Sequence, residues 1–459
     1  MKKIIIAILL MQATVSSGQI KNIDSLKLIQ LINNKIDTFI TDYKVPGAVI
    51  SVVKDGKPFY TKGIGYDDLT TKESVDPLSS QFRVASITKT FTAIGIMQLV
   101  EQGKLDLHAD IRTYLPSDMY KWDAPHSFTI HHLLTHTAGI EHSGYRVSQA
   151  SINAKSLDVF VQTAISNQIH EPGTLFSYSN KGYGILGLLI EKMSGLSYED
   201  YIAQMILEPM GMMHSTVYQH TEEHPIDRAV QPYRWDGDQY ITRQRLFLVN
   251  PAASNLNTTG VDMALFMTAM MDSAQVDGHP IITKASYELM LQRHYAPSLD
   301  FEAMGYGMMI EDNKGYAGYN HGGGIDGFGS YYIFYPELDL GLFMSESGGQ
   351  ENAAFAFQVI YGILEELIEK RERPEEMQVP KDVAISQAEM YAGTYQQTTV
   401  TKSTFERGQM LFGINEQVIK HIGDGQITYR DKVYKPLDNN TYQQVDLSLI
   451  HISEPTRPY

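Results

Sequence analysis

Strand-like segments occur near both ends of this chain, with a long helical stretch between them, and this arrangement limits the folds available to it. Residues 47–66, GAVISVVKDGKPFYTKGIGY, alternate and turn at Asp55-Gly56, a pattern typical of a β-hairpin. Residues 330–347, SYYIFYPELDLGLFMSES, hold two more strand-like runs around a Pro-Glu-Leu-Asp turn. Residues 25–43 and 352–370 have apolar residues at helical spacing. We therefore predict one α+β domain whose sheet is assembled from both ends of the chain.

The C-terminal part is predicted to form a separate module. A charged, proline-bearing stretch places a linker at residues 373–385. From 386 to 446, short β-type runs alternate with turn signals such as Asp424-Gly425, which predicts a small β module. Residues 447–457, LSLIHISEPTR, resemble the translation of a transposase sequencing adapter. Our hypothesis is that residues 447–459 are an artefact and that the module is incomplete.

Composition excludes several classes of function. The 459 residues carry a formal net charge of −16 and include no cluster of basic residues, so a nucleic-acid partner is not expected. The absence of cysteine excludes disulfides, thiolate nucleophiles and cysteine-based zinc sites. A hydrophobic content of 43% with 20% charged residues is typical of a folded globular protein.

The N-terminus has the three-part form of a secretory signal. Lys2 and Lys3 precede an apolar run from Ile4 to Leu10, and small and polar residues follow up to a plausible cleavage site after Gly18. The alternative is a membrane anchor, but the apolar run is too short to span a bilayer. We expect residues 1–18 to be removed and residues 19–372 to form the main domain, in the periplasm or outside the cell. No later segment is long and apolar enough to be a membrane helix.

The segment FRVASITKTFTAIG (residues 82–95) places Ser86 and Lys89 at the head of an apolar run. If this run is a helix, positions i and i+3 share a face, and Lys89 is able to take the Ser86 proton if burial lowers its pKa. A serine that opens a helix is more often only a cap. A second Ser-x-x-Lys, from Ser51 to Lys54, lies in a predicted strand, where the two side chains point to opposite faces.

Two further segments contain residues with suitable chemistry. Tyr178-Ser179-Asn180 precedes another buried-looking helix; here a tyrosine can relay a proton and an asparagine can orient a lysine or a substrate. His321-Gly322-Gly323-Gly324 stands at the edge of a strand-like run, where glycines permit the close approach of a substrate or of another backbone. Taken alone, a polar loop and a flexible hairpin explain these segments equally well.

Taken together and in this order, the three segments resemble the serine β-lactamase and penicillin-binding-protein superfamily, and most closely its class C, or β-lactamase-related, branch. The flanking segments HHLLTHTAGI and HGGGIDGFGSYYIFYPELDLGL also resemble that branch. The similarity extends over roughly residues 25–370. It implies an antiparallel sheet flanked by helices, an all-helical region, and no metal or organic cofactor. The small β module resembles C-terminal domains that some members carry.

The resemblance also implies roles for individual residues. Ser86 is implied as the acylated nucleophile, Lys89 as its base and Tyr178 as the proton relay to the leaving group. Asn180 is implied as a contact of substrate and lysine. His321 takes the place of the strand lysine in a Lys-Thr-Gly motif, and Gly323 belongs with it to the substrate-binding strand. The backbone N–H groups of Ser86 and Gly324 are implied as the oxyanion hole.

His-Gly-Gly in place of Lys-Thr-Gly is a departure from the family pattern. Near neutral pH a histidine is charged only part of the time, and glycine has no hydroxyl, so the usual grip on a substrate carboxylate is weakened. We therefore expect a small-molecule or peptide substrate that is an ester, an amide or a D-amino-acid peptide. Efficient β-lactam hydrolysis is less favoured.

Two other classes of function stay open. His132 and His136, in HHLLTH, have the i, i+4 spacing of metal ligands on a helix, but position 133 is Leu instead of the glutamate that a zinc peptidase of this spacing needs. We interpret these histidines as structural. The other alternative is a non-catalytic ligand-binding module of the same fold.

Overall fold

The computed structural model describes residues 24–371 apart from 117–123, 141–155, 165–167, 222–223, 247, 297–301 and 349–353, together with six strands between residues 393 and 451. The predicted signal peptide and the whole of the predicted linker lie outside the described residues. Within them, no helix has the length and apolarity needed to cross a membrane.

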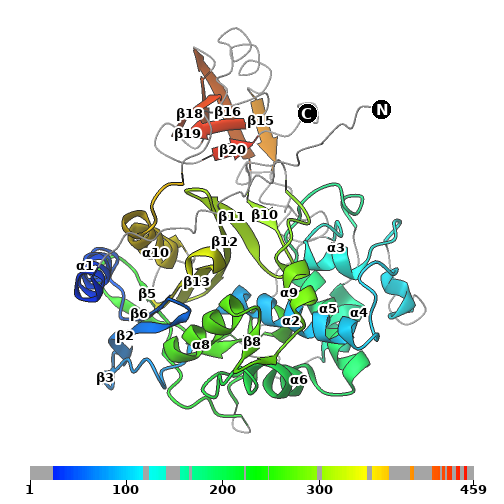
Figure 1. Cartoon of the computed structure of the whole chain (residues 1–459), viewed down its shortest axis with the longest axis horizontal. Helices are drawn as coiled ribbons and strands as arrows, with labels where there is room; N and C mark the ends of the chain where they lie inside the picture. The colour runs from blue at the N-terminus through cyan, green and yellow to red at the C-terminus, as the bar shows by residue number, and fades with distance from the viewer. Residues whose placement is uncertain are drawn as a thin grey trace, which may run out of the picture.

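The main domain is built on an eight-stranded antiparallel sheet in the order β10-β11-β12-β13-β14-β1-β2-β3 (Figure 1). The N-terminal hairpin pairs with the C-terminal one along its whole first strand, from Gly47 opposite Ser347 to Lys54 opposite Leu340. The sheet is therefore assembled from both ends of the chain, as the sequence predicts. Its strands are β1 (Gly47–Lys54), β2 (Lys57–Asp68), β3 (Glu73–Ser74), β10 (Ala303–Met304), β11 (Met309–Asn313), β12 (Tyr316–Ile325), β13 (Phe328–Tyr335) and β14 (Leu340–Ser347).

Both faces of this sheet are covered by helices, because the strands place apolar side chains alternately on either side. Ile50 and Val52 of β1 pack with α1 (Ser25–Tyr43) and α10 (Ala354–Leu367), which lie side by side on the outer face (Figure 1). Val49 and Val53 belong to the larger core on the opposite face, which is covered by α8 (Gly260–Met271). Because of this two-sided burial, β1, β13 and β14 are buried almost throughout and are rich in apolar residues.

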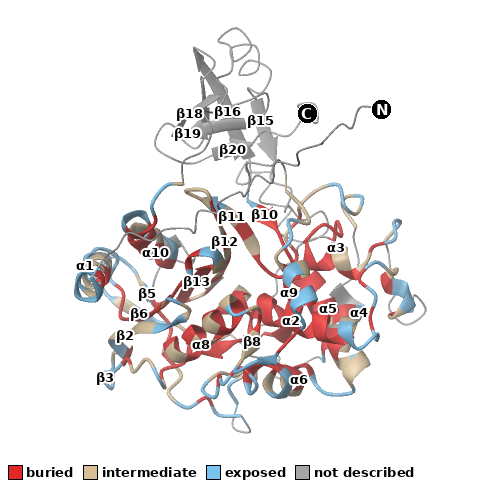
Figure 2. Ribbon diagram, in the orientation of Figure 1, coloured by how far each residue is buried: buried red, intermediate tan, exposed pale blue. Residues whose placement is uncertain are grey.

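A helical region follows the first strands. Its central helix, α2 (Thr88–Glu101), is buried from Thr88 to Leu99 and packs against α5 (Asn180–Ser194), and both lie in the interior (Figure 2). A helix that is apolar around its whole circumference belongs inside a protein, as the sequence predicts for this segment. The remaining helices are α3 (Ile130–Leu134), α4 (Leu157–Ala164), α6 (Tyr198–Ile202), α7 (Pro251–Ser254) and α9 (Lys284–Met290).

Small two-stranded sheets connect these layers. The one that matters for the site pairs β4 (Phe82–Arg83) with β7 (Asn257–Thr258), so that the segments before α2 and before α8 lie side by side. The other two pair β5 (Tyr233–Trp235) with β6 (Tyr240–Thr242), and β8 (Gln275–Val276) with β9 (His279–Pro280).

The C-terminal strands form a second, six-stranded antiparallel sheet in sequential order. Its strands are β15 (Gly393–Gln396), β16 (Glu416–Gly423), β17 (Gln426–Tyr429), β18 (Lys432–Pro436), β19 (Thr441–Gln444) and β20 (Leu449–His451). The predicted module runs from 386 to 446, and its bounds stay a prediction. Strand β20 falls within the segment that resembles an adapter sequence, and the pairing of its three residues does not test that hypothesis.

Candidate active site

Ser86 lies in a tight turn at the head of α2. The turn is a 3₁₀ helix, Ala85–Ile87, and α2 itself begins at Thr88, so Ser86 precedes the α-helix instead of opening it. Ala85 has a positive φ of 46°, a left-handed conformation that costs a non-glycine residue of the order of 1 kcal/mol or more. In the segment 81–99, all of it described, every residue is buried except Ser86, which is half-buried. The turn thus exposes one side chain of a rigid, buried segment.

Three threonines of α2 fix this helix to its surroundings. The Thr88 hydroxyl donates to the Ala85 carbonyl and accepts from the Leu256 N–H. The Thr92 hydroxyl donates a hydrogen bond to the Ala252 carbonyl at 2.7 Å, and the Thr90 hydroxyl donates one to the Gly307 carbonyl at 2.9 Å. Because these partners are distant in sequence, the position of Lys89, between Thr88 and Thr90, is set by tertiary packing.

Lys89 is a fully buried amine beside the serine. Its Nζ atom lies 3.0 Å from Ser86 Oγ and donates to the Ala253 carbonyl at 2.9 Å. Among the described residues it forms no ion pair with a carboxylate, and burial lowers its pKa well below the ordinary value of 10.5. A neutral amine at this distance is able to accept the serine proton. The two residues that the sequence pairs by helical spacing are in hydrogen-bond contact.

Tyr178 lies next to this amine. Lys89 Nζ is 4.9 Å from the centroid of the Tyr178 ring and 5.6 Å from that of Tyr183. The ring of His136 packs on Tyr178 with centroids 4.3 Å apart, and its Nδ1 accepts a hydrogen bond from the Ser179 N–H. His136 is therefore a positioning residue for the Tyr178 segment. The sequence offered no signal for it beyond the HHLLTH motif.

Asn180 is the first residue of α5 and is buried next to this cluster. Its carbonyl accepts from the Asn250 side chain at 2.7 Å, and its Oδ1 has no hydrogen-bond partner among the described residues. Lys89 Nζ therefore makes no hydrogen bond to Asn180 Oδ1 among the described residues, and the implied contact of Asn180 with lysine and substrate stays a prediction. The Ala253 carbonyl of α7 binds the lysine instead, a contact that no sequence pattern indicates, since a carbonyl is present at every residue.

Strand β12 packs against the nucleophile turn at Gly323. A Cβ atom at this position would lie 2.0 Å from the Val84 carbonyl oxygen and 3.3 Å from the Ser86 backbone nitrogen. Only glycine therefore permits this approach. Gly324 is the next residue of the strand, opposite Gly329 of β13. The His-Gly-Gly-Gly segment lies in the second half of the ten-residue strand β12, where it pairs with β13 alone, because the pairing of β12 with β11 ends at Asn320. This strand structure contradicts the alternative of a flexible hairpin.

His321 lies two residues before Gly323, on the same side of β12. The side chain is buried; Nδ1 is 2.7 Å from the Gly322 carbonyl, and Nε2 has no hydrogen-bond partner among the described residues. Burial, aided by the charge of Lys89, lowers its pKa to about 3. The expectation of a ring that is charged part of the time at neutral pH is therefore wrong, because the imidazole is held neutral. It cannot supply the positive charge of the lysine in a Lys-Thr-Gly motif.

The histidines of HHLLTH do not share a helix face. Helix α3 ends at Leu134, and His136 has a φ of 57°. His131 packs instead with His294 and Tyr306, whose rings are stacked with centroids 3.9 Å apart, and burial lowers the pKa of His131 to about 4. Among the described residues, no group of three or more His, Asp or Glu side chains is arranged to hold a metal ion.

The sheet covered by helices on both faces, with a serine–lysine pair at the head of a buried helix, defines a protein of the β-lactamase/transpeptidase-like class. A family model described as Beta-lactamase matches residues 32–361. The chain belongs to this family.

Comparison with individual proteins agrees with this assignment. Protein flp of Staphylococcus aureus (strain MRSA252) is 26% identical over 318 residues, which cover 68% of this chain and 62% of that protein. A candidate penicillin-binding protein of Bacillus subtilis (strain 168), PbpX, is 29% identical over 280 residues, which cover 60% of this chain and 64% of that protein. These matches span less than two thirds of the length of either relative.

A solved structure is similar over nearly the whole chain. The octameric penicillin-binding protein homologue from Pyrococcus abyssi superposes with a TM-score of 0.61 at 25% sequence identity, covering 92% of this chain and 93% of that one.

Proposed function

We propose that this protein is an exported serine hydrolase that acts by acyl transfer through Ser86. Its substrate is an ester, an amide or a D-amino-acid peptide, and it acts in the periplasm or outside the cell. The observation that carries the proposal is the buried Lys89 amine, 3.0 Å from Ser86 Oγ and without a carboxylate partner among the described residues. Because its pKa is lowered, such an amine is able to lose its proton closer to neutral pH and act as a base.

The reaction proceeds in two halves. Lys89 takes the proton of the Ser86 hydroxyl while Oγ forms a bond to the substrate carbonyl carbon, and the carbonyl oxygen becomes an oxyanion held by the backbone N–H groups of Ser86 and Gly324. The bond to the leaving group then breaks, and the proton on Lys89 reaches that group through Tyr178. In the second half, water attacks the acyl carbon and gives a proton to Lys89, the bond from that carbon to Ser86 Oγ breaks, and Oγ takes up the proton as the acid is released.

The state of His321 supports esters and neutral amides over β-lactams and over peptides that are cleaved next to a terminal carboxylate. A neutral imidazole offers no counter-charge to a carboxylate near the acylated carbon, whereas the unpartnered Nε2 of His321 and Oδ1 of Asn180 offer polar contacts to an uncharged substrate. We infer that the site favours substrates that lack a carboxylate next to the scissile bond.

The decisive experiment compares the wild type with Ser86→Ala against nitrocefin, p-nitrophenyl butyrate and a D-Ala-D-Ala peptide. Ser51→Ala is the matched control, because Ser51 begins the other Ser-x-x-Lys and its hydroxyl donates to the Gly260 carbonyl. We expect turnover that Ser51→Ala retains and Ser86→Ala loses, and a fluorophosphonate adduct on Ser86 by mass spectrometry. The absence of both turnover and adduct in a folded wild type contradicts the proposal and favours a non-catalytic binding module.

A further inference from the structure

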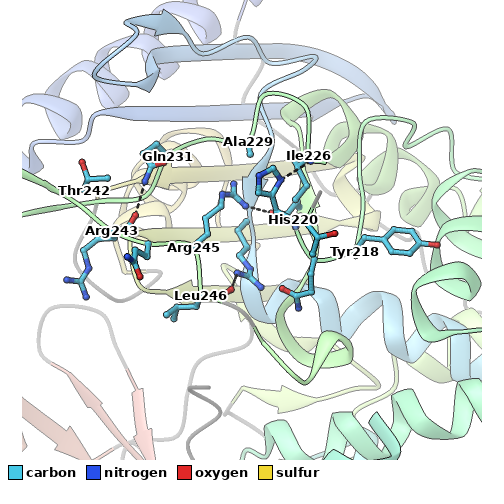
Figure 3. A pocket seen from close by; sticks show the side chains of 14 residues that line it. Tyr218, His220, Ile226, Ala229, Gln231, Thr242, Arg243, Arg245 and Leu246 are labelled. Carbon is cyan, nitrogen blue, oxygen red and sulfur yellow. Dashed lines mark hydrogen bonds between the residues drawn. The ribbon is translucent and has the colours of Figure 1, made fainter. Parts of the chain in front are cut away.

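Figure 3 shows a cavity of about 680 Å³ in the main domain. Its walls come from residues 218–221 and 226–231, from residues 242–246 at the end of β6 and after it, and from Arg83 of β4 and Asn257 of β7. None of the side chains assigned above to catalysis lines it. Its size is in the range of cavities that hold small organic ligands.

The wall of this cavity is positively charged in a chain whose net charge is −16. Arg83, Arg243 and Arg245 line it, and no aspartate or glutamate does. Arg243 is paired with Asp326. Arg83 and Arg245 form no ion pair with any carboxylate of the described residues, so their charges are not compensated.

The acceptors around these two guanidinium groups are all neutral. Arg83 is 4% exposed and donates to the Leu246 carbonyl and to Asn255 Oδ1. Arg245 donates to Asn257 Oδ1 at 2.9 Å and to the Val230 carbonyl at 3.0 Å. The Nε–H of each has no acceptor among the described residues. A buried cation without a counter-ion is unfavourable, and an anion at this place relieves that cost.

Burial lowers the pKa values of both arginines, as expected for buried cations that have no counter-ion. It lowers the pKa of Arg83 to about 9, with a contribution from the neighbouring charge of Arg245, and that of Arg245 to about 10. Both guanidinium groups remain protonated at neutral pH. Two cations that repel each other inside one wall create a favourable position for a negative group.

Other lining groups indicate the kind of molecule. His220 Nδ1 accepts a hydrogen bond from the Ile226 N–H at 2.9 Å, so the neutral ring carries its proton on Nε2 as a donor. Ile226, Ala229 and Leu246 add apolar surface (Figure 3). A cavity with donors, two cations and apolar walls suits an organic molecule with an anionic end. We propose that it binds a small molecule bearing a carboxylate, which Arg245 and Arg83 recognise.

The cavity is connected to the catalytic turn by short segments. Arg83 stands three residues before Ser86, and its partner Asn255 stands two residues after Ala253, whose carbonyl binds Lys89. The carboxylate belongs either to the distal end of the hydrolase substrate or to a separate molecule. Both sources require the same two arginines.

Calorimetric titration tests the site without using the hydrolase activity. Glutarate is the probe and glutaramide is its uncharged counterpart, each added to wild type, Arg245→Gln and Arg234→Gln, the last removing an exposed arginine of β5 that does not line the cavity. We expect glutarate, but not glutaramide, to bind wild type and Arg234→Gln, and to bind Arg245→Gln at least about tenfold more weakly. Equal glutarate affinity in both variants, no binding to the wild type, or binding of inorganic phosphate in place of glutarate overturns the proposal.

Two further measurements complete the test. If Arg245→Gln does not fold, a crystal structure of wild type with glutarate replaces it; a carboxylate against Arg245 supports the site and one elsewhere overturns it. The source of the carboxylate follows from two esters, p-nitrophenyl butyrate and the p-nitrophenyl monoester of glutarate. If the wild type hydrolyses the charged ester faster and Arg245→Gln loses this preference, the site binds the distal end of the substrate. If glutarate binds but the wild type shows no such preference, the site binds a separate ligand.

Discussion

Gly323 and Val84 are in direct backbone contact: a Cβ atom on Gly323 would lie 2.0 Å from the Val84 carbonyl oxygen. Val84 precedes the turn that holds Ser86, and Gly323 is part of β12, the strand proposed to complete the oxyanion hole. The missing side chain therefore sets the distance between the nucleophile and the strand. Geometry of this kind must be accurate to a fraction of an ångström for catalysis.

Gly323→Ala is expected to reduce kcat/KM by about a hundredfold or more, because a misplaced oxyanion hole loses two or more orders of magnitude in rate. Steady-state kinetics on whichever substrate the wild type turns over measures the loss. Gly362→Ala in α10 is the matched control, since the nearest atom to its added Cβ, on Lys35, is 3.6 Å away. Wild-type kinetics in Gly323→Ala would show that the strand and the turn do not act together.

Lys89→Arg tests the proposed base. Arginine does not lose its proton near neutral pH and so cannot act as the base; kcat/KM is therefore expected to fall by about 10²- to 10⁴-fold. In the wild type, activity requires the neutral amine. It should therefore rise with pH and reach its plateau well below pH 10.5, because burial lowers the pKa of Lys89.

Lys192→Arg, at a partly exposed position on α5, is the control for this substitution and should retain wild-type rates. A pH profile that rises only near pH 10.5 would indicate that Lys89 is charged in the working enzyme and is not its base.

His321 gives a prediction about both pH and substrate. Since its pKa is lowered to about 3, the ring is neutral throughout pH 5–8, and His321→Gln should leave the shape of the pH–rate profile in that range unchanged. His321→Lys restores a cation beside the site. We expect it to raise kcat/KM for nitrocefin, which carries a carboxylate, about tenfold relative to p-nitrophenyl butyrate. An unchanged ratio of the two rates would show that position 321 does not contact the substrate.

Sequence patterns predicted those features that depend on local periodicity. The i, i+3 spacing of Ser86 and Lys89 places both side chains on one side of the turn and of the helix that follows it. The strand signals at residues 47–66 and 330–347 belong to one sheet, as their positions near the two ends of the chain predict.

Features that depend on long-range packing could not be predicted in this way. The Ala253 carbonyl reaches Lys89 from 164 positions away, and the positive φ of Ala85 is imposed by the strand and helix around it, not by its own side chain. The neutral state of His321 follows from complete burial, which a Gly-rich sequence does not indicate. The charged cavity likewise combines Arg83 and Arg245 from segments far apart in the chain.

Glu311 gives a prediction about stability rather than activity. This carboxyl of β11 accepts hydrogen bonds from Tyr335 of β13 and Tyr361 of α10, and burial raises its pKa to about 7 from 4.5. Between these values the folded state binds more protons than the unfolded state, so the free energy of unfolding falls as the pH rises from about 4.5 to 7. Glu311→Gln keeps a neutral group there and removes this loss.

Urea unfolding of the wild type and Glu311→Gln at pH 5, 6, 7 and 8 measures the difference. The wild type is expected to lose about 1–3 kcal/mol relative to the variant between pH 5 and 8. Glu288→Gln, at an exposed position on α9, should follow the wild type. Parallel curves for the wild type and Glu311→Gln would mean that the carboxyl titrates alike in both states. The charge on Glu311 would then not alter the free energy of unfolding, and the packing of α10 against β11 and β13 would not depend on pH through this residue.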